Sequence, residues 1–167
     1  NLLSQEQATA TNLTSIDIFS CISAHGRTGA CILAIRDGKI RGTKTYYFKD
    51  NLMDDLDSLF QRLIFFYYQN TFSLPEKIIL TLKPTNLTLI QEAIDLKFHQ
   101  SIQISARIPS AARQLVKLAL LNAHQVVENK IQQSDKYQYA INDLATQLKI
   151  DNIEITIEGY DISHHSG

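Results

Sequence analysis

The chain has 167 residues, of which 44% are hydrophobic and 20% are charged, an ordinary composition for a globular domain. Its formal net charge of −1 excludes a strongly basic domain, so any contact with nucleic acid must come from a local patch. No apolar run approaches the ~20 residues that span a bilayer, so we expect no association with a membrane.

The first half predicts three antiparallel strands and a helix. A polar lead-in over residues 1–15 is followed by runs of β-type residues, with a turn at 25–29 and a tight hairpin at Asp37-Gly38. Apolar residues then recur at helical spacing from Leu56 to Tyr67, which predicts an amphipathic helix. The predicted strands are 16–24, 30–36 and 40–48.

The second half alternates strands with helices. Asn86 is expected to cap one helix, and Ser110, after Pro109, to cap a long helix running to about Gln132. Apolar spacing from Tyr137 to Leu148 predicts a separate amphipathic helix. The strands are predicted at 77–82, 101–107 and 154–161.

The predicted order, β-β-β-α-β-α-β-α, is that of the ribonuclease-H-like fold. This α/β fold has a mixed sheet with helices on both faces. Here a C-terminal connecting helix and an extra strand would follow it. The expected divisions are a lead-in at 1–15, the ribonuclease-H-like domain at 16–133, the connecting helix at 134–150 and the start of another domain at 151–167.

The final segment carries the most specific motif. Residues 158–164, Glu-Gly-Tyr-Asp-Ile-Ser-His, resemble the Glu-Cys-Phe-Asp-Ile-Ser-His strand that opens the C-terminal nuclease of the UvrC family. The resemblance continues upstream in the expected order. Its other landmarks are the Ala-Cys hairpin with a Gly-Lys turn at 29–42, a Leu-Ala…Asn-Ala helix at 118–123 and the helix at 144–148.

The resemblance implies a metal-dependent endonuclease of bacterial nucleotide excision repair. Such a parent enzyme would use Mg²⁺ or Mn²⁺ to incise damaged DNA, act with UvrB in the cytoplasm and serve the SOS response. Asp161 matches the motif's aspartate and would be a catalytic metal ligand. The other catalytic groups and the UvrB-binding element would lie outside this chain. We therefore expect a monomeric, truncated piece that binds no metal and cuts no DNA alone.

The first and last predicted strands can be laid over each other. The segment Cys21-Ile22-Ser23 then aligns with Asp161-Ile162-Ser163. In that alignment Cys21 stands at a degenerate catalytic position, because a neutral thiol is a poor ligand for Mg²⁺. Residues 16–133 would then be a non-catalytic copy, although so short a similarity can also arise by chance. Cys21 and Cys31 are expected to be buried free thiols.

Basic residues concentrate in the predicted hairpin. They are consistent either with a modest phosphate-contacting surface or with the solvated face of an edge strand, and the second interpretation is favoured. Two further arginines precede the long helix, where the family usually has a Gly-containing basic segment. The possible DNA contacts are Arg27, Arg36, Lys39, Arg41, Lys44, Arg107 and Arg113.

Two functions are therefore compatible with the sequence. The first is a scaffold within UvrC that orients DNA or protein relative to the nuclease. The alternative is a stand-alone ribonuclease-H-like module that binds another protein and has no nuclease role. Continuation of the parent sequence past Gly167 with further Asp and His residues would favour the first.

Overall fold

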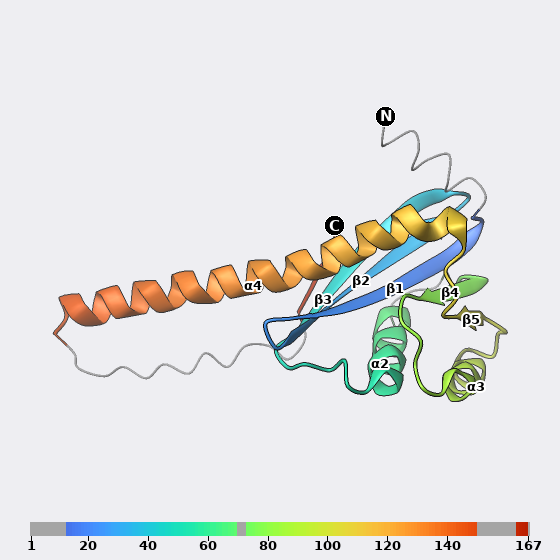
Figure 1. Cartoon of the computed structure of the whole chain (residues 1–167), viewed down its shortest axis with the longest axis horizontal. Helices are drawn as coiled ribbons and strands as arrows, with labels where there is room; N and C mark the ends of the chain where they lie inside the picture. The colour runs from blue at the N-terminus through green and yellow to red at the C-terminus, as the bar shows by residue number, and fades with distance from the viewer. Residues whose placement is uncertain (1–12, 70–72, 150–162, 167) are drawn as a thin grey trace.

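The computed structural model describes residues 13–69, 73–149 and, for the backbone, 163–166. A six-stranded sheet in the order β5-β4-β1-β2-β3-β6 carries helices on both faces (Figure 1). The strands are β1 (Ser15–Ala24), β2 (Arg27–Arg36), β3 (Lys39–Phe48), β4 (Lys77–Leu80), β5 (Gln103–Ser105) and β6 (Ser163–Ser166). The helical elements are α2 (Leu56–Tyr68), α3 (Leu87–Phe98), the 3₁₀ turn η1 (Ser110–Ala112) and α4 (Arg113–Gln147).

Strands β1, β2 and β3 form two antiparallel hairpins, as predicted. Asp37 and Gly38 have φ values of 53° and 72°, the positive values that a two-residue type I′ turn requires. His25 and Gly26 have the same pair of values, so the first turn is shorter than predicted and β2 begins at Arg27. Because both turns are this tight, all ten residues of β1 pair with β2.

Strands β4 and β5 extend the sheet in parallel with β1. Helix α2 precedes β4 and helix α3 precedes β5, so a helix connects each of these parallel strands to the strand before it in the chain. Asn86 caps α3 as predicted, because its side chain accepts from the backbone N–H of Leu89. The sheet and its helices confirm the ribonuclease-H-like order, with β5 shorter than predicted.

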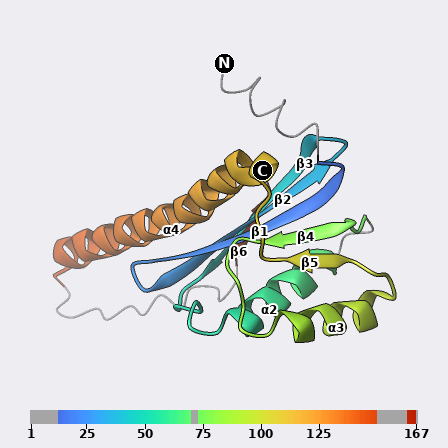
Figure 2. The same ribbon diagram turned by 45° about the vertical axis from the view of Figure 1, so that its right-hand side comes forward.

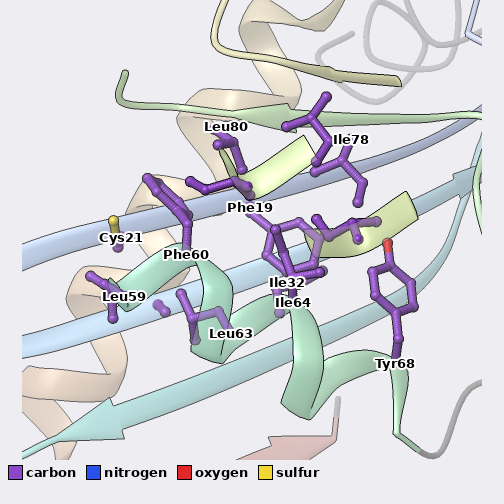
Figure 3. Close-up of a cluster of buried hydrophobic side chains, with 14 of the residues drawn as sticks. Phe19, Cys21, Ile32, Leu59, Phe60, Leu63, Ile64, Tyr68, Ile78 and Leu80 are labelled. Atoms are coloured by element: carbon purple, nitrogen blue, oxygen red, sulfur yellow. The ribbon is translucent and has the colours of Figure 1, made fainter. Parts of the chain in front are cut away.

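Helices α2 and α3 cover one face of the sheet and α4 covers the other (Figure 2). The alternation of side chains along β1 divides the core accordingly. Phe19 and Cys21 belong to the cluster under α2 and α3, part of which Figure 3 shows, whereas Ile16 and Ile18 belong to the cluster under α4. The sheet is therefore buried on both faces along its central strand.

Helix α4 is one continuous helix of 35 residues, so the prediction of two separate helices is wrong. Its first half packs on the sheet and its second half projects past it (Figure 1). The cap prediction is also wrong, since Ser110 lies in η1 and α4 begins at Arg113 without a side-chain cap. Although α4 is long, neither it nor any other described helix is apolar enough to cross a membrane.

The predicted strand at 154–161 lies outside the described residues. A short strand immediately after it, β6, pairs antiparallel with the outer edge of β3. In this register Ser163 lies opposite Tyr47 and Ser166 lies opposite Lys44. The backbone of the closing motif is therefore hydrogen-bonded to the sheet two residues after Asp161.

Candidate functional site

Cys21, the predicted degenerate position, lies on β1 and pairs with Ala30 on β2. Its side chain is only 1% exposed and belongs to the same apolar cluster as Phe19, Leu59 and Phe60 (Figure 3). Burial raises the pKa of this thiol to about 12, so the group is neutral at neutral pH. A neutral thiol inside an apolar cluster is not a binding site for a hard divalent cation.

No group of three His, Cys, Asp or Glu side chains capable of holding a metal occurs in the part of the chain that the structure describes. Asp161 lies outside that part, so its role as a metal ligand stays a prediction. The donor type is suitable, because carboxylate oxygens are the ligands that Mg²⁺ and Mn²⁺ prefer. One carboxylate does not, however, hold the two ions of a two-metal site.

Both cysteines are free and buried, as predicted, and they face opposite sides of the sheet. Burial raises the pKa of the Cys31 thiol to about 12 as well. We therefore expect neither thiol of the native protein to react with iodoacetamide at about pH 8.5, where exposed thiols ionise. Mass spectrometry should show two modified thiols only after unfolding in guanidinium. Rapid modification of Cys21 in the native protein would contradict its burial.

A buried carboxylate, Asp17, lies near the start of β1 and was missed by the sequence reasoning. Arg36 Nη1 lies 2.7 Å from Asp17 Oδ1, and the Tyr68 hydroxyl donates to Oδ2. Burial raises the pKa of Asp17, although the bonds from Arg36 and Tyr68 oppose this shift. Arg36 also donates to the backbone oxygen of Ser73, 3.2 Å away. The sequence signal that could have revealed this site is a single acidic residue within an apolar strand.

The basic residues of the hairpin do not form a single patch. Lys39 and Arg41 are exposed at one end of the sheet, where the Arg36 guanidinium is bound to the buried Asp17. Arg27 is at the opposite end of the ten-residue β2, about 30 Å away at about 3.3 Å per residue. Lys44 lies between them on β3 and is half-buried. A ligand that reached both ends would have to be extended.

Arg107 and Arg113 lie outside the strands, on either side of η1. Both are exposed, and the backbone N–H of Arg107 donates to the Ser105 hydroxyl. Arg113 is the first residue of α4. The predicted contacts of these two arginines with DNA stay predictions.

Arg27 belongs to a cluster around Tyr47 on the α4 face of the sheet. Its Nη1 donates to the Tyr47 hydroxyl over 2.7 Å, and its guanidinium carbon lies 5.9 Å from the ring centroid. Lys130, on α4, places its ammonium nitrogen 5.9 Å from the same centroid. Both distances fall within the range of a cation–π contact. We call Arg27, Tyr47 and Lys130 the Tyr47 cluster.

Two histidines share one carboxylate close to Lys130 in the sequence. His25 Nε2 lies 2.8 Å from Glu128 Oε1, and His124 Nε2 lies 3.6 Å from the same oxygen. Sequence reasoning missed both Lys130 and Glu128. The i,i+4 spacing of His124 and Glu128 could have revealed one contact, but the contacts with the hairpin depend on how α4 crosses the sheet.

Comparison with known protein families shows to which family the chain belongs. The profile described as the UvrC Ribonuclease H-like domain matches residues 15–130. The chain belongs to this family. The UvrC match ends at Lys130, although α4 continues without a break to Gln147.

Curated UvrC relatives cover most of this chain. It is 29% identical to the UvrABC system protein C of Psychrobacter sp. (strain PRwf-1), over 96% of the chain and 27% of that protein. Identity to the protein of the same name from Syntrophomonas wolfei is 25%, over 91% of the chain and 25% of that protein. The chain thus spans about a quarter of the length of these relatives. No solved structure gives a significant match.

Proposed function

We propose that this chain is a non-catalytic scaffold within the nuclease subunit of a UvrABC excinuclease. Residues 15–130 would orient DNA and the nuclease relative to each other, and the segment around Asp161 would begin the nuclease itself. The parent protein would incise damaged DNA with Mg²⁺ or Mn²⁺, bind UvrB through a segment outside this chain and work in the bacterial cytoplasm. The chain would be a monomer.

The principal support for the scaffold role is the environment of Cys21. The family match spans residues 15–130, and within that span the position aligned with Asp161 is a neutral thiol in an apolar cluster. Replacing an aspartate with such a thiol removes the hard oxygen ligand that phosphodiester hydrolysis with Mg²⁺ needs. A ribonuclease-H-like domain without that ligand retains its shape and its surface, which suit a scaffold.

Asp161 supports the nuclease assignment of the closing segment. A bound Mg²⁺ or Mn²⁺ would activate water and stabilise the charge that develops on the phosphodiester. Asp161 would hold that ion, and further carboxylates of the parent protein would complete its ligands. Because a single carboxylate is insufficient for two ions, this chain alone should not cleave DNA.

The decisive experiment is an incision assay on damaged duplex with the full parent protein, UvrA and UvrB. We expect Asp161→Asn to abolish incision and Cys21→Ser to leave it unchanged, because only the first change removes a metal ligand. Adding Cys21→Asp to Asp161→Asn should not restore incision, since the described residues contain no group of three His, Cys, Asp or Glu side chains that could hold a metal with residue 21. A circular dichroism spectrum like that of the native protein would control for misfolding.

Incision by the Asp161→Asn protein at the native rate would overturn the nuclease assignment. The alternative, a stand-alone protein-interaction module, would then explain the chain better. Cleavage of DNA by the isolated chain with Mn²⁺, lost in Asp161→Asn, would instead show that the chain is active by itself.

A further inference from the structure

We infer that the Tyr47 cluster, Arg27 and Lys130 with the ring between β3 and α4, is a contact site for the phosphodiester backbone of nucleic acid. This inference rests on the proposed function and names one surface through which the scaffold would touch DNA. The chemistry that it requires is an oxyanion with room for two cationic donors, and a backbone phosphate provides it.

The charges of the cluster are not balanced within the fold. Arg27 and Lys130 approach one ring at 5.9 Å each, and neither forms an ion pair with a carboxylate of the described residues. The carboxylate nearest to Lys130 along α4, Glu128, is shared by His25 and His124. Two cations held beside one aromatic ring repel each other, and a bound anion would relieve that repulsion.

The cluster is assembled from three elements of the fold. Arg27 begins β2, Tyr47 is near the end of β3 and Lys130 lies on α4. Tyr47 is only 6% exposed and packs against Val126 and Val127. Its hydroxyl accepts from Arg27, which fixes the guanidinium against the ring. Side chains that are already held in place, as Tyr47 and Arg27 are, lose little conformational entropy when a ligand binds.

The position of the cluster favours a polymer over a free phosphate. Lys39 and Arg41 are exposed at the opposite end of the same hairpin, and about 30 Å corresponds to about nine base pairs of duplex. Tyr47 is also the register partner of Ser163 in β6, which follows Asp161 by two residues in the sequence. A DNA strand held at the cluster would therefore pass beside the backbone that leads from the nuclease motif.

The test measures how binding of a labelled duplex to the whole chain depends on salt between about 50 and 200 mM. We expect Arg27→Gln/Lys130→Gln to reduce the slope of log affinity against log salt by about 2, since each lost phosphate contact removes about one unit. The matched control is Lys83→Gln/Lys97→Gln, which removes the same charge from exposed positions after β4 and on α3. The control should keep the native slope.

Two further measurements distinguish a direct contact with DNA from a structural role of these residues and from binding of free phosphate. Arg27→Lys/Lys130→Arg keeps both charges and should retain the native slope, whereas loss of the slope there would indicate a structural role only. Replacing chloride with inorganic phosphate at constant ionic strength should leave DNA binding unchanged. Displacement by phosphate, or an unaltered slope in Arg27→Gln/Lys130→Gln, would overturn the inference without affecting the result of the incision assay.

Discussion

Gly29→Ala is expected to destabilise the protein by about 3 kcal/mol, a large effect for the addition of one methyl group. Gly29 lies on β2 where α4 crosses the sheet. A Cβ atom there would lie far inside the van der Waals contact distance of the Ala123 carbonyl oxygen and 2.8 Å from Val127 Cγ2. Because one of these neighbours is helix backbone, only a shift of α4 away from the sheet removes the clash. Urea unfolding followed by circular dichroism would measure the loss.

Gly42→Ala is the matched control on the neighbouring strand. A Cβ at Gly42 would meet only the Ala34 side chain, at 3.9 Å, which is ordinary contact. We expect Gly42→Ala to change the free energy of unfolding by less than about 1 kcal/mol, the scale of the glycine backbone entropy. Equal stability of the Gly29→Ala and Gly42→Ala proteins would show that α4 does not depend on close approach at Gly29.

Asp17→Ala is expected to cost about 3–5 kcal/mol, the usual loss when one partner of a buried ion pair is removed. The change would leave the Arg36 guanidinium and the Tyr68 hydroxyl without the acceptor that both now use. Replacing all three residues together, as Asp17→Leu/Arg36→Met/Tyr68→Phe, should recover most of the loss because no unpaired polar group remains. Failure of the triple replacement to recover stability would indicate that packing, rather than pairing, dominates at this site.

The raised pKa of Asp17 gives this network a definite pH dependence. Between the ordinary aspartate pKa of 3.8 and the raised pKa, the folded protein binds more protons at Asp17 than the unfolded chain does. The pH-dependent part of the stability that Asp17 contributes is therefore complete below pH 3.8 and is lost as the pH rises through the folded pKa. The stability advantage of the native protein over Asp17→Asn should grow on acidification from neutral pH. If the advantage shrinks instead, the ion pair with Arg36 lowers the pKa of Asp17 by more than burial raises it.

The sheet was predictable because its signals are local. Asp37-Gly38 specifies a type I′ turn by its own conformational preference, and Asn86 caps its helix through its own side chain. Ser110 offered an equally local signal, and yet α4 starts at Arg113. The long helix was predicted to end near Gln132, but that region contains no Gly or Pro to end it, and α4 continues to Gln147.

The contacts between polar side chains could not be predicted, because they join residues that are distant in the sequence. Asp17 meets Tyr68 across 51 positions, and His25 meets Glu128 across 103. In the sequence, Arg36 resembled an exposed cation, but its guanidinium is bound to the carboxylate of Asp17. The residue pattern of β1 alone does not indicate a partner for Asp17. The burial of Cys21 was foreseen, since thiols in β-rich segments are usually buried.

The continuity of α4 has a mechanical consequence. At about 1.5 Å per residue a helix of this length measures about 50 Å, and the part beyond the sheet has no joint among the described residues. The helix therefore fixes the direction and rotational phase in which the main chain leaves the module at Gln147. Each residue inserted after Gln132 would move the exit by about 1.5 Å and turn it by about 100°. Insertions of seven residues, close to two full turns, should disturb the parent protein less than insertions of five.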